Sequence, residues 1–288
     1  MTWRTVVIHN KAKLEFRLNH LLVRGEEEKL IHLSEVGTII IESTAVSLTC
    51  ALLSELSKRK IKVIFCDEKY NPESELVPYY GSHNCSGQLK HQICWADEKK
   101  AICMQSILKQ KIISQAKFVE EICQEKANYL FQLADTVEKN DITNREGMAA
   151  KYYFNSIFGD EFSRSGKKGD INSALNYGYA ILLSSFNREI VGNGYNTCLG
   201  LKHCNEFNYF NLSSDLIEPF RVEFDKTVFE KQGNVFDCNF KMAIVDTLNR
   251  KVKFDGQSMF LVNAIKLYVK SVFDFLNEED TSIKFLET

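Results

Sequence analysis

Short runs of β-branched and aliphatic residues, separated by turn residues, fill roughly the first 80 positions of the chain. Apolar spacing of three and four predicts one helix among them, over residues 46–56. Because the connections are short, we expect the strands to pair mainly as antiparallel hairpins. The predicted strands are Val6–Ile8, Leu14–Leu18, Leu21–Val23, Leu30–Leu33, Thr38–Ile41 and Lys62–Cys66.

The pattern changes after Gly87, where apolar residues recur at helical spacing. We therefore predict an α+β fold, with a small N-terminal mainly-β domain over residues 1–82. A larger all-helical domain follows over residues 83–288, with the boundary inside the segment Tyr79–Gly87. The positions that carry the helical period are Leu89, Ile93, Ala96, Ile102, Ile107 and Leu108, and then Phe118, Ile122, Ala127, Leu130 and Leu133.

Composition and charge narrow the class of protein. Apolar residues make up 44% of the chain and charged residues 26%, which is typical of a globular protein. With a net charge of −2, binding to nucleic acid would depend on a local basic patch. The nine cysteines form no Cys-x-x-Cys pair, which indicates reduced thiols. The start, Met1–Thr5, does not read as a signal peptide, and no apolar run spans about 18 residues. We expect a cytoplasmic protein without membrane contact.

Glu146 is the first candidate for chemistry. It heads the apolar face of a helix predicted over Arg145–Phe158, so its carboxylate is expected to face inward and to need a partner. The sequence Thr143-x-x-Glu146 also matches a capping box, and on local sequence alone the cap is the better interpretation. The other members of the face are Ala149, Ala150, Tyr153 and Ile157.

An imidazole and a second carboxylate follow later in the chain. His203 lies in an irregular stretch, where a lone histidine is more often a hydrogen-bonded residue than a ligand. Asp215 and Glu218 share one face of a helix that starts near Ser213, and Arg221 lies three residues further on, as in an ordinary salt-bridged surface. Two carboxylates and an imidazole can nevertheless hold a divalent cation that promotes phosphate chemistry.

A basic loop over Ser163–Gly169 offers cations and exposed backbone amides to phosphate groups. It lacks the Walker spacing, and a solvated turn between helices is the alternative. The apolar helix that starts at Asp170 is predicted to end at Gly192-Asn193-Gly194.

Four motifs, taken in order, resemble one known family. They are Glu146-Gly147-x-Ala149-Ala150-x-x-Tyr153, the segment Asp170–Tyr179, Leu199-Gly200-x-x-His203, and Asp215-Leu216-x-Glu218-Pro219-Phe220-Arg221. Together with the layout of the two domains, they are similar to the CRISPR-associated adaptation integrases, the Cas1 family. The compact length and the acidic residue at 218 resemble the version found with single-effector, type II systems.

The resemblance implies a metal-dependent DNA endonuclease and integrase that inserts short foreign DNA into a CRISPR array. Glu146, His203 and Glu218 would be the catalytic metal ligands for Mg²⁺ or Mn²⁺, and Asp215 a supporting or alternative ligand. The β domain would form a homodimer, and two homodimers would flank a dimer of the small partner Cas2. Double-stranded DNA, as protospacer and CRISPR repeat, would be the substrate. Other adaptation proteins and the RNA-guided effector nuclease are further implied partners.

Charge alone gives candidate contacts to DNA phosphates: Arg145, Arg164, Lys167, Lys168 and Arg221, together with Lys58, Arg59 and Lys60. Two other functions stay open from the residues. One is a helical metal-dependent phosphohydrolase that acts on nucleotides, and the other is a non-catalytic DNA-binding scaffold.

Overall fold

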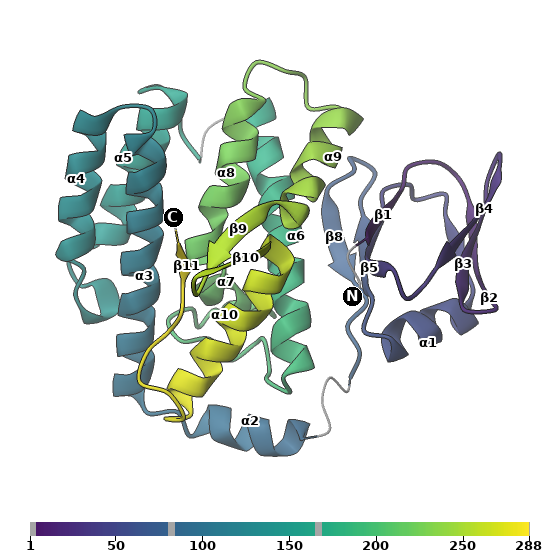
Figure 1. The fold of residues 1–288 in the computed structure, drawn as a ribbon, viewed down its shortest axis with the longest axis horizontal. Helices are drawn as coiled ribbons and strands as arrows, with labels where there is room; N and C mark the ends of the chain where they lie inside the picture. The colour runs from purple at the N-terminus through teal and green to yellow at the C-terminus, as the bar shows by residue number, and fades with distance from the viewer. Residues whose placement is uncertain (1–3, 80–83, 165–168, 288) are drawn as a thin grey trace. The chain divides into compact units, whose positions relative to one another are not determined.

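The computed structural model describes residues 4–79, 84–164 and 169–287. The chain forms two compact units, Met1–His83 and Asn84–Thr288, and most of the helices and strands of each are labelled in Figure 1. The first unit is rich in strands and the second is mostly helical, so the predicted α+β class is confirmed.

The described part of the first unit, residues 4–79, contains two four-stranded sheets. One has the order β1 (Arg4–Ile8), β5 (Val36–Ile41), β7 (Lys62–Cys66), β8 (Pro72–Glu75), and the other has the order β4 (Glu28–His32), β3 (His20–Arg24), β2 (Lys13–Arg17), β6 (Ser47–Leu48).

Strand direction differs between the two sheets. The hairpin prediction is confirmed for β2, β3 and β4, which are antiparallel neighbours. It is wrong for β1, β5 and β7, which run parallel. Parallel neighbours need a long crossover. Along the chain, the β2–β3–β4 hairpins connect β1 to β5, and the segment that contains helix α1 (Cys50–Lys58) connects β5 to β7.

The core of the first unit explains why β5 is central. All of its residues Val36–Ile41 except Gly37 are buried, as expected for a strand covered on both faces. Helix α1 adds Leu52 and Leu56 to the same core, and the Thr49 hydroxyl caps it by accepting the N–H of Leu52.

The second unit is built on two long helices, α3 and α6. Helix α3 packs on α4, α5, α8 and α10, and on the 3₁₀ turn Glu218–Phe220. None of the helices in the described ranges has the length and apolar character of a membrane span. The helices of the unit are α2 (Cys85–Ile93), α3 (Asp97–Glu120), α4 (Gln124–Asp135), α5 (Arg145–Phe158), α6 (Asp170–Gly192), α7 (Asn211–Leu216), α8 (Arg221–Glu230), α9 (Cys238–Asp246) and α10 (Leu261–Leu276).

The helical unit also carries a small antiparallel sheet that the sequence analysis did not anticipate. Strand β9 (Lys251–Phe254) pairs with β10 (Gln257–Phe260) on one side and with β11 (Leu286–Glu287) on the other. Asp255 and Gly256 connect β9 to β10 with φ angles of 51° and 73°. An Asp-Gly pair with positive φ at both positions is the signature of a two-residue hairpin turn, so the second unit is not all-helical.

Candidate metal centre

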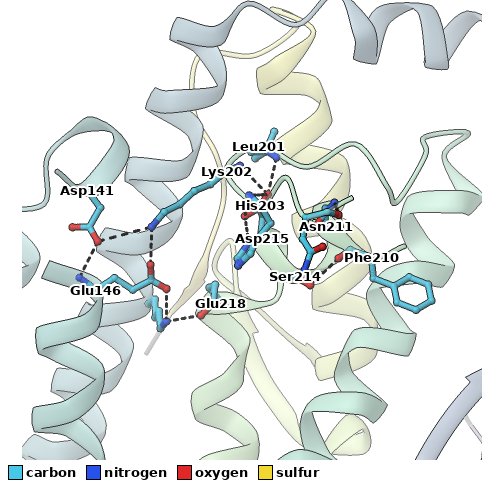
Figure 2. Close-up of polar contacts among 12 residues, drawn as sticks. Asp141, Glu146, Leu201, Lys202, His203, Phe210, Asn211, Ser214, Asp215 and Glu218 are labelled. Carbon is cyan, nitrogen blue, oxygen red and sulfur yellow. Dashed lines mark hydrogen bonds and ion pairs between the residues drawn. The ribbon is translucent and has the colours of Figure 1, made fainter. Parts of the chain in front are cut away.

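Glu146 stands in the first turn of α5, where another carboxylate caps the helix. Asp141 accepts the backbone N–H of Arg145 through Oδ1 at 2.7 Å and that of Glu146 through Oδ2 at 3.2 Å. Asn144, at the N-cap position, has a φ of 52° and makes no side-chain cap. The capping-box prediction is therefore wrong, because Asp141 already satisfies these amides and leaves the Glu146 side chain available (Figure 2).

Two lysines neutralise Glu146. Nζ of Lys111 lies 2.9 Å from Oε1, and Nζ of Lys202 lies 2.9 Å from Oε2. Burial by itself would raise the pKa of the carboxyl. The two ammonium groups outweigh that effect and lower the pKa of Glu146 to about 2.

Glu218 opens a 3₁₀ turn between α7 and α8. Pro219 follows it directly, and a proline at that point interrupts a continuing helix. The side chain of Glu218 is only 4% exposed. Its Oε2 lies 2.6 Å from Nζ of Lys111 and its Oε1 lies 2.9 Å from Nη2 of Arg221. Burial raises the pKa of Glu218, but the charges of Arg221 and Lys111 prevail and lower it.

His203 is positioned by Asp215, whose carboxylate is fully buried. Oδ2 of Asp215 accepts the N–H groups of Leu201 at 2.6 Å and of Lys202 at 3.0 Å, and Oδ1 lies 2.6 Å from Nδ1 of His203 (Figure 2). With Nδ1 donating to the carboxylate, Nε2 keeps a free lone pair, which is the arrangement of a metal-ligating histidine. The hydrogen bond to Asp215 also raises the pKa of His203.

Gly200 is required by this loop. A Cβ atom at position 200 would lie 2.4 Å from the carbonyl oxygen of His203 and 2.9 Å from Oδ2 of Asp215. The glycine of the Leu-Gly-x-x-His motif therefore allows the loop to close over the Asp215 carboxylate.

The structure brings the predicted site residues to one region. Glu146 and Glu218 share Lys111, and both charges act on His203, since each raises the pKa of its imidazole. Asp215 serves as an acceptor of backbone and imidazole hydrogen bonds. As the side chains stand, however, no three acidic, histidine or cysteine groups in the described ranges converge closely enough to hold a metal ion. The ammonium of Lys111 lies between the two glutamates instead.

The residues nevertheless suit a divalent cation. Oε2 of Glu218 is buried, and the partner that the structure gives it is the Lys111 ammonium, 2.6 Å away. Two carboxylates and one imidazole are a donor set typical of Mg²⁺ or Mn²⁺. A site of this kind could bind such an ion if Lys111 moved aside.

Comparison with known proteins identifies the family. The family described as "CRISPR associated protein Cas1" matches residues 5–235. The chain belongs to the Cas1 family. The resemblance inferred from the four motifs is thus confirmed.

Relatives of the Cas1 family match along most of the chain. A "CRISPR-associated endonuclease Cas1" from Neisseria meningitidis serogroup C (strain 8013) is 34% identical over 278 residues, which cover 94% of this chain and 91% of the relative. A Cas1 protein from Thermotoga maritima shares the fold with a TM-score of 0.78 at 17% identity, covering 96% of this chain and 97% of its own. A casposase bound to integration product has a TM-score of 0.79 at 20% identity, covering 98% and 92%.

Three residues of this Cas1 site were not recognised from the sequence: Asp141, Lys111 and Lys202. Lys111 interrupts the apolar stripe of α3, where its neighbours Ile107 and Ile112 are fully buried, and a lysine in such a position signals a buried partner. Lys202 lies inside the Leu-Gly-x-x-His motif. Asp141 has no comparable signal, because its capping role depends on the left-handed conformation of the loop before α5.

A buried network lies behind the Cas1 site. Asp225 on α8 accepts hydrogen bonds from the hydroxyl groups of Tyr153 at 3.0 Å and Tyr179 at 2.5 Å. Burial raises the pKa of Asp225 to about 6, although both hydroxyl groups oppose the shift. The guanidinium of Arg221, which pairs with Glu218, stacks 4.6 Å from the centre of the Tyr179 ring. The network therefore supports one partner of Glu218.

The basic residues proposed from charge have different surroundings. Arg164 donates to Asn172 and Asn176 at 2.8 Å each and stacks on Tyr179, so internal contacts occupy it. Lys58 pairs with Glu55 at the surface. Among the described residues, the guanidinium of Arg145 has one hydrogen-bonding contact, with the sulfur of Met148. Lys167 and Lys168 lie outside the described residues. As DNA contacts, all of these residues stay predictions.

Proposed function

We propose that this chain is a divalent-metal-dependent DNA integrase and endonuclease that inserts short DNA segments into a CRISPR array. The observation that carries the proposal is that Glu146 and Glu218, from two separate segments, share the ammonium of Lys111, while the charges of both act on the imidazole of His203, from a third. Its family supports the same conclusion, since the Neisseria relative is named an endonuclease and the casposase was captured with an integration product.

The chemistry proposed is phosphodiester transfer, in which a 3′-hydroxyl of the incoming DNA attacks a phosphorus atom of the target strand. One P–O bond forms and one breaks, and the strand that leaves carries a new 3′-hydroxyl. A divalent cation held by Glu146, Glu218 and Nε2 of His203 would polarise the phosphate and lower the pKa of the attacking hydroxyl.

The protein's own residues have distinct parts in this reaction. Asp215 fixes the tautomer and direction of the His203 ring. Arg221 holds Oε1 of Glu218 from the buried side. Lys202 is 36% exposed beside Glu146, so it can offset charge on a bound phosphate.

The proposed partners are those found in solved complexes of proteins with this fold. Solved structures with this fold include a Cas6-RT-Cas1–Cas2 complex and a TtCas1–DNA complex. We propose that this chain likewise acts on double-stranded DNA with Cas2, as a homodimer formed through its first unit, in a type II system with the effector nuclease nearby.

The test is an integration assay with short duplex DNA, Cas2 and Mn²⁺. His203→Ala and Glu218→Ala are each expected to abolish strand transfer while the protein stays folded and still binds DNA. Glu125→Ala, on the exposed side of α4, is the control and should integrate normally. Normal integration by both site variants would refute the proposed site. DNA binding without strand transfer by the unsubstituted protein would favour a scaffold. Nucleotide hydrolysis without strand transfer would favour a phosphohydrolase.

A further inference from the structure

Lys111 occupies an unusual position for a lysine. It projects from the middle of α3, its side chain is 10% exposed, and its single ammonium contacts Glu146 at 2.9 Å and Glu218 at 2.6 Å. Burying an ammonium is costly unless charged partners compensate, and here both partners are the proposed metal ligands.

Each carboxylate oxygen of the two glutamates has its own contact with a cation. Lys202 pairs with Oε2 of Glu146, and Arg221 pairs with Oε1 of Glu218. Lys111 contacts the remaining oxygen of each glutamate, Oε1 of Glu146 and Oε2 of Glu218. An ion bridging the two glutamates would need these same two oxygens. Since two cations at such short range repel strongly in a buried site, the ammonium and a divalent ion cannot both lie between the glutamates.

We propose that Lys111 is a resident counter-cation, which occupies the metal position in the unloaded protein and is exchanged for the divalent ion when the site loads. This inference rests on the proposed function, because it takes Glu146 and Glu218 as metal ligands. Without the ammonium, no cation would lie between Oε1 of Glu146 and the buried Oε2 of Glu218, and these two oxygens would repel each other. The ammonium stabilises the unloaded site. Because it has to be displaced when a metal ion binds, it also lowers the affinity of the site for that ion.

The experiment measures Mn²⁺ binding to the full-length, DNA-free protein by calorimetry and electron paramagnetic resonance. Lys111→Met removes the ammonium and keeps the stem. We expect its Kd for Mn²⁺ to be at least about tenfold lower than that of the unsubstituted protein, because no ammonium has to be displaced. Its Tm without metal should be lower and should recover with Mn²⁺, as the ion replaces the missing charge.

Two further substitutions on the same helix serve as controls. Lys109→Met removes a lysine that pairs with the exposed Asp135, and it should change neither the Mn²⁺ affinity nor the gain of stability with Mn²⁺. Lys111→Arg keeps the charge and should bind Mn²⁺ no more tightly than the unsubstituted protein. If Lys111→Met folds only with Mn²⁺, the proposal is supported. If it folds under neither condition, Lys111→Gln takes its place with the same expected gain.

The outcomes separate this inference from the proposed function. Glu218→Gln should remove the Mn²⁺ site. If it does so while the neutral Lys111 variants bind Mn²⁺ no more tightly than the unsubstituted protein, the counter-cation role is overturned and the metal site stands. If Mn²⁺ binding is unchanged in Glu218→Gln, the metal site itself is overturned.

Discussion

Nδ1 of His203 and Oδ1 of Asp215 lie 2.6 Å apart, and the same carboxylate accepts backbone N–H groups of the histidine's own loop. One buried carboxylate thus fixes both the ring and the backbone that carries it. An imidazole held in this way presents Nε2 in a single direction, which a surface histidine does not do.

Asp215→Asn should therefore weaken the reaction without removing a proposed ligand. We expect strand transfer to fall by about 10–100-fold, the range for losing an outer-shell partner of a ligating histidine. The substitution also loses charge-assisted hydrogen bonds, at a cost of about 1.5–3 kcal/mol in the free energy of unfolding. Integration rates at several Mn²⁺ concentrations, together with chemical denaturation, measure both effects. A variant that loses stability but transfers strands at the normal rate would show that Asp215 serves the fold alone.

Gly200→Ala should disrupt the loop that carries His203. Its new Cβ would lie 2.4 Å from the His203 carbonyl oxygen, so the backbone around His203 has to shift. We expect at least a tenfold loss of strand transfer, since a misplacement near 1 Å costs about 100-fold. Gly192→Ala is the matched control, because a Cβ at the end of α6 meets no atom within 4 Å. Equal integration by the two alanine variants would contradict the tight closure of the loop.

Asp225 should give the stability of the protein a recognisable pH dependence. Its pKa is about 6 in the folded protein, against a usual value of 3.8, because burial disfavours the charged form. Between about pH 4 and pH 6 the unfolded chain holds fewer protons at this position than the folded protein. The stability contributed by Asp225 is therefore complete below about pH 4 and is lost as the pH rises to 6, by about 1.4 kcal/mol per unit of pKa shift.

Asp225→Asn should remove this loss of stability between pH 4 and pH 6. Denaturation curves across the interval measure the difference in slope between the variant and the unsubstituted protein. Asp160→Asn, at an exposed position, should leave the slope as it is. The same slope in Asp225→Asn and in the unsubstituted protein would mean that Asp225 titrates normally.

Tyr179→Phe tests the support behind Glu218. The phenylalanine ring can still stack under Arg221, but Asp225 loses the hydroxyl that donates to Oδ1 at 2.5 Å. We expect the free energy of unfolding to fall by about 1–3 kcal/mol at pH 7, and less at pH 4, where Asp225 is protonated. Denaturation at the two pH values checks this, and an equal loss at both would argue against a charged Asp225 at neutral pH.

Much of the helical unit was predictable because its period is regular. Helix α5 spans the expected residues 145–158, and its predicted inner face is buried at Ala149, Tyr153 and Ile157. The pairing of β1 with β5 was not predictable from short connections, because the intervening hairpins form a separate sheet. Periodicity describes one element at a time, whereas strand order depends on contacts far apart in sequence.

The sequence indicated the candidate site residues but not the contacts between them. Glu146 matched a capping box locally, and only the turn that brings in Asp141 excludes that interpretation. Lys111 precedes Glu218 by more than a hundred positions, so no local pattern joins them. Ionic contacts between distant segments follow from tertiary packing, which sequence spacing does not record.

The short step from Asp215 to Glu218 makes this part of the chain intolerant of changes in length. The carboxylate of Asp215 accepts backbone amides, whereas that of Glu218, three residues later, pairs with cations. Helix α7 ends between the two residues. One inserted residue would turn Glu218 by about 100–120°, away from Lys111. The Asp255-Gly256 turn, at the surface between β9 and β10, contacts Lys284 and Glu287 and none of the candidate site residues. Tags and labels therefore belong at that hairpin, and the segment between Asp215 and Glu218 has to keep its length.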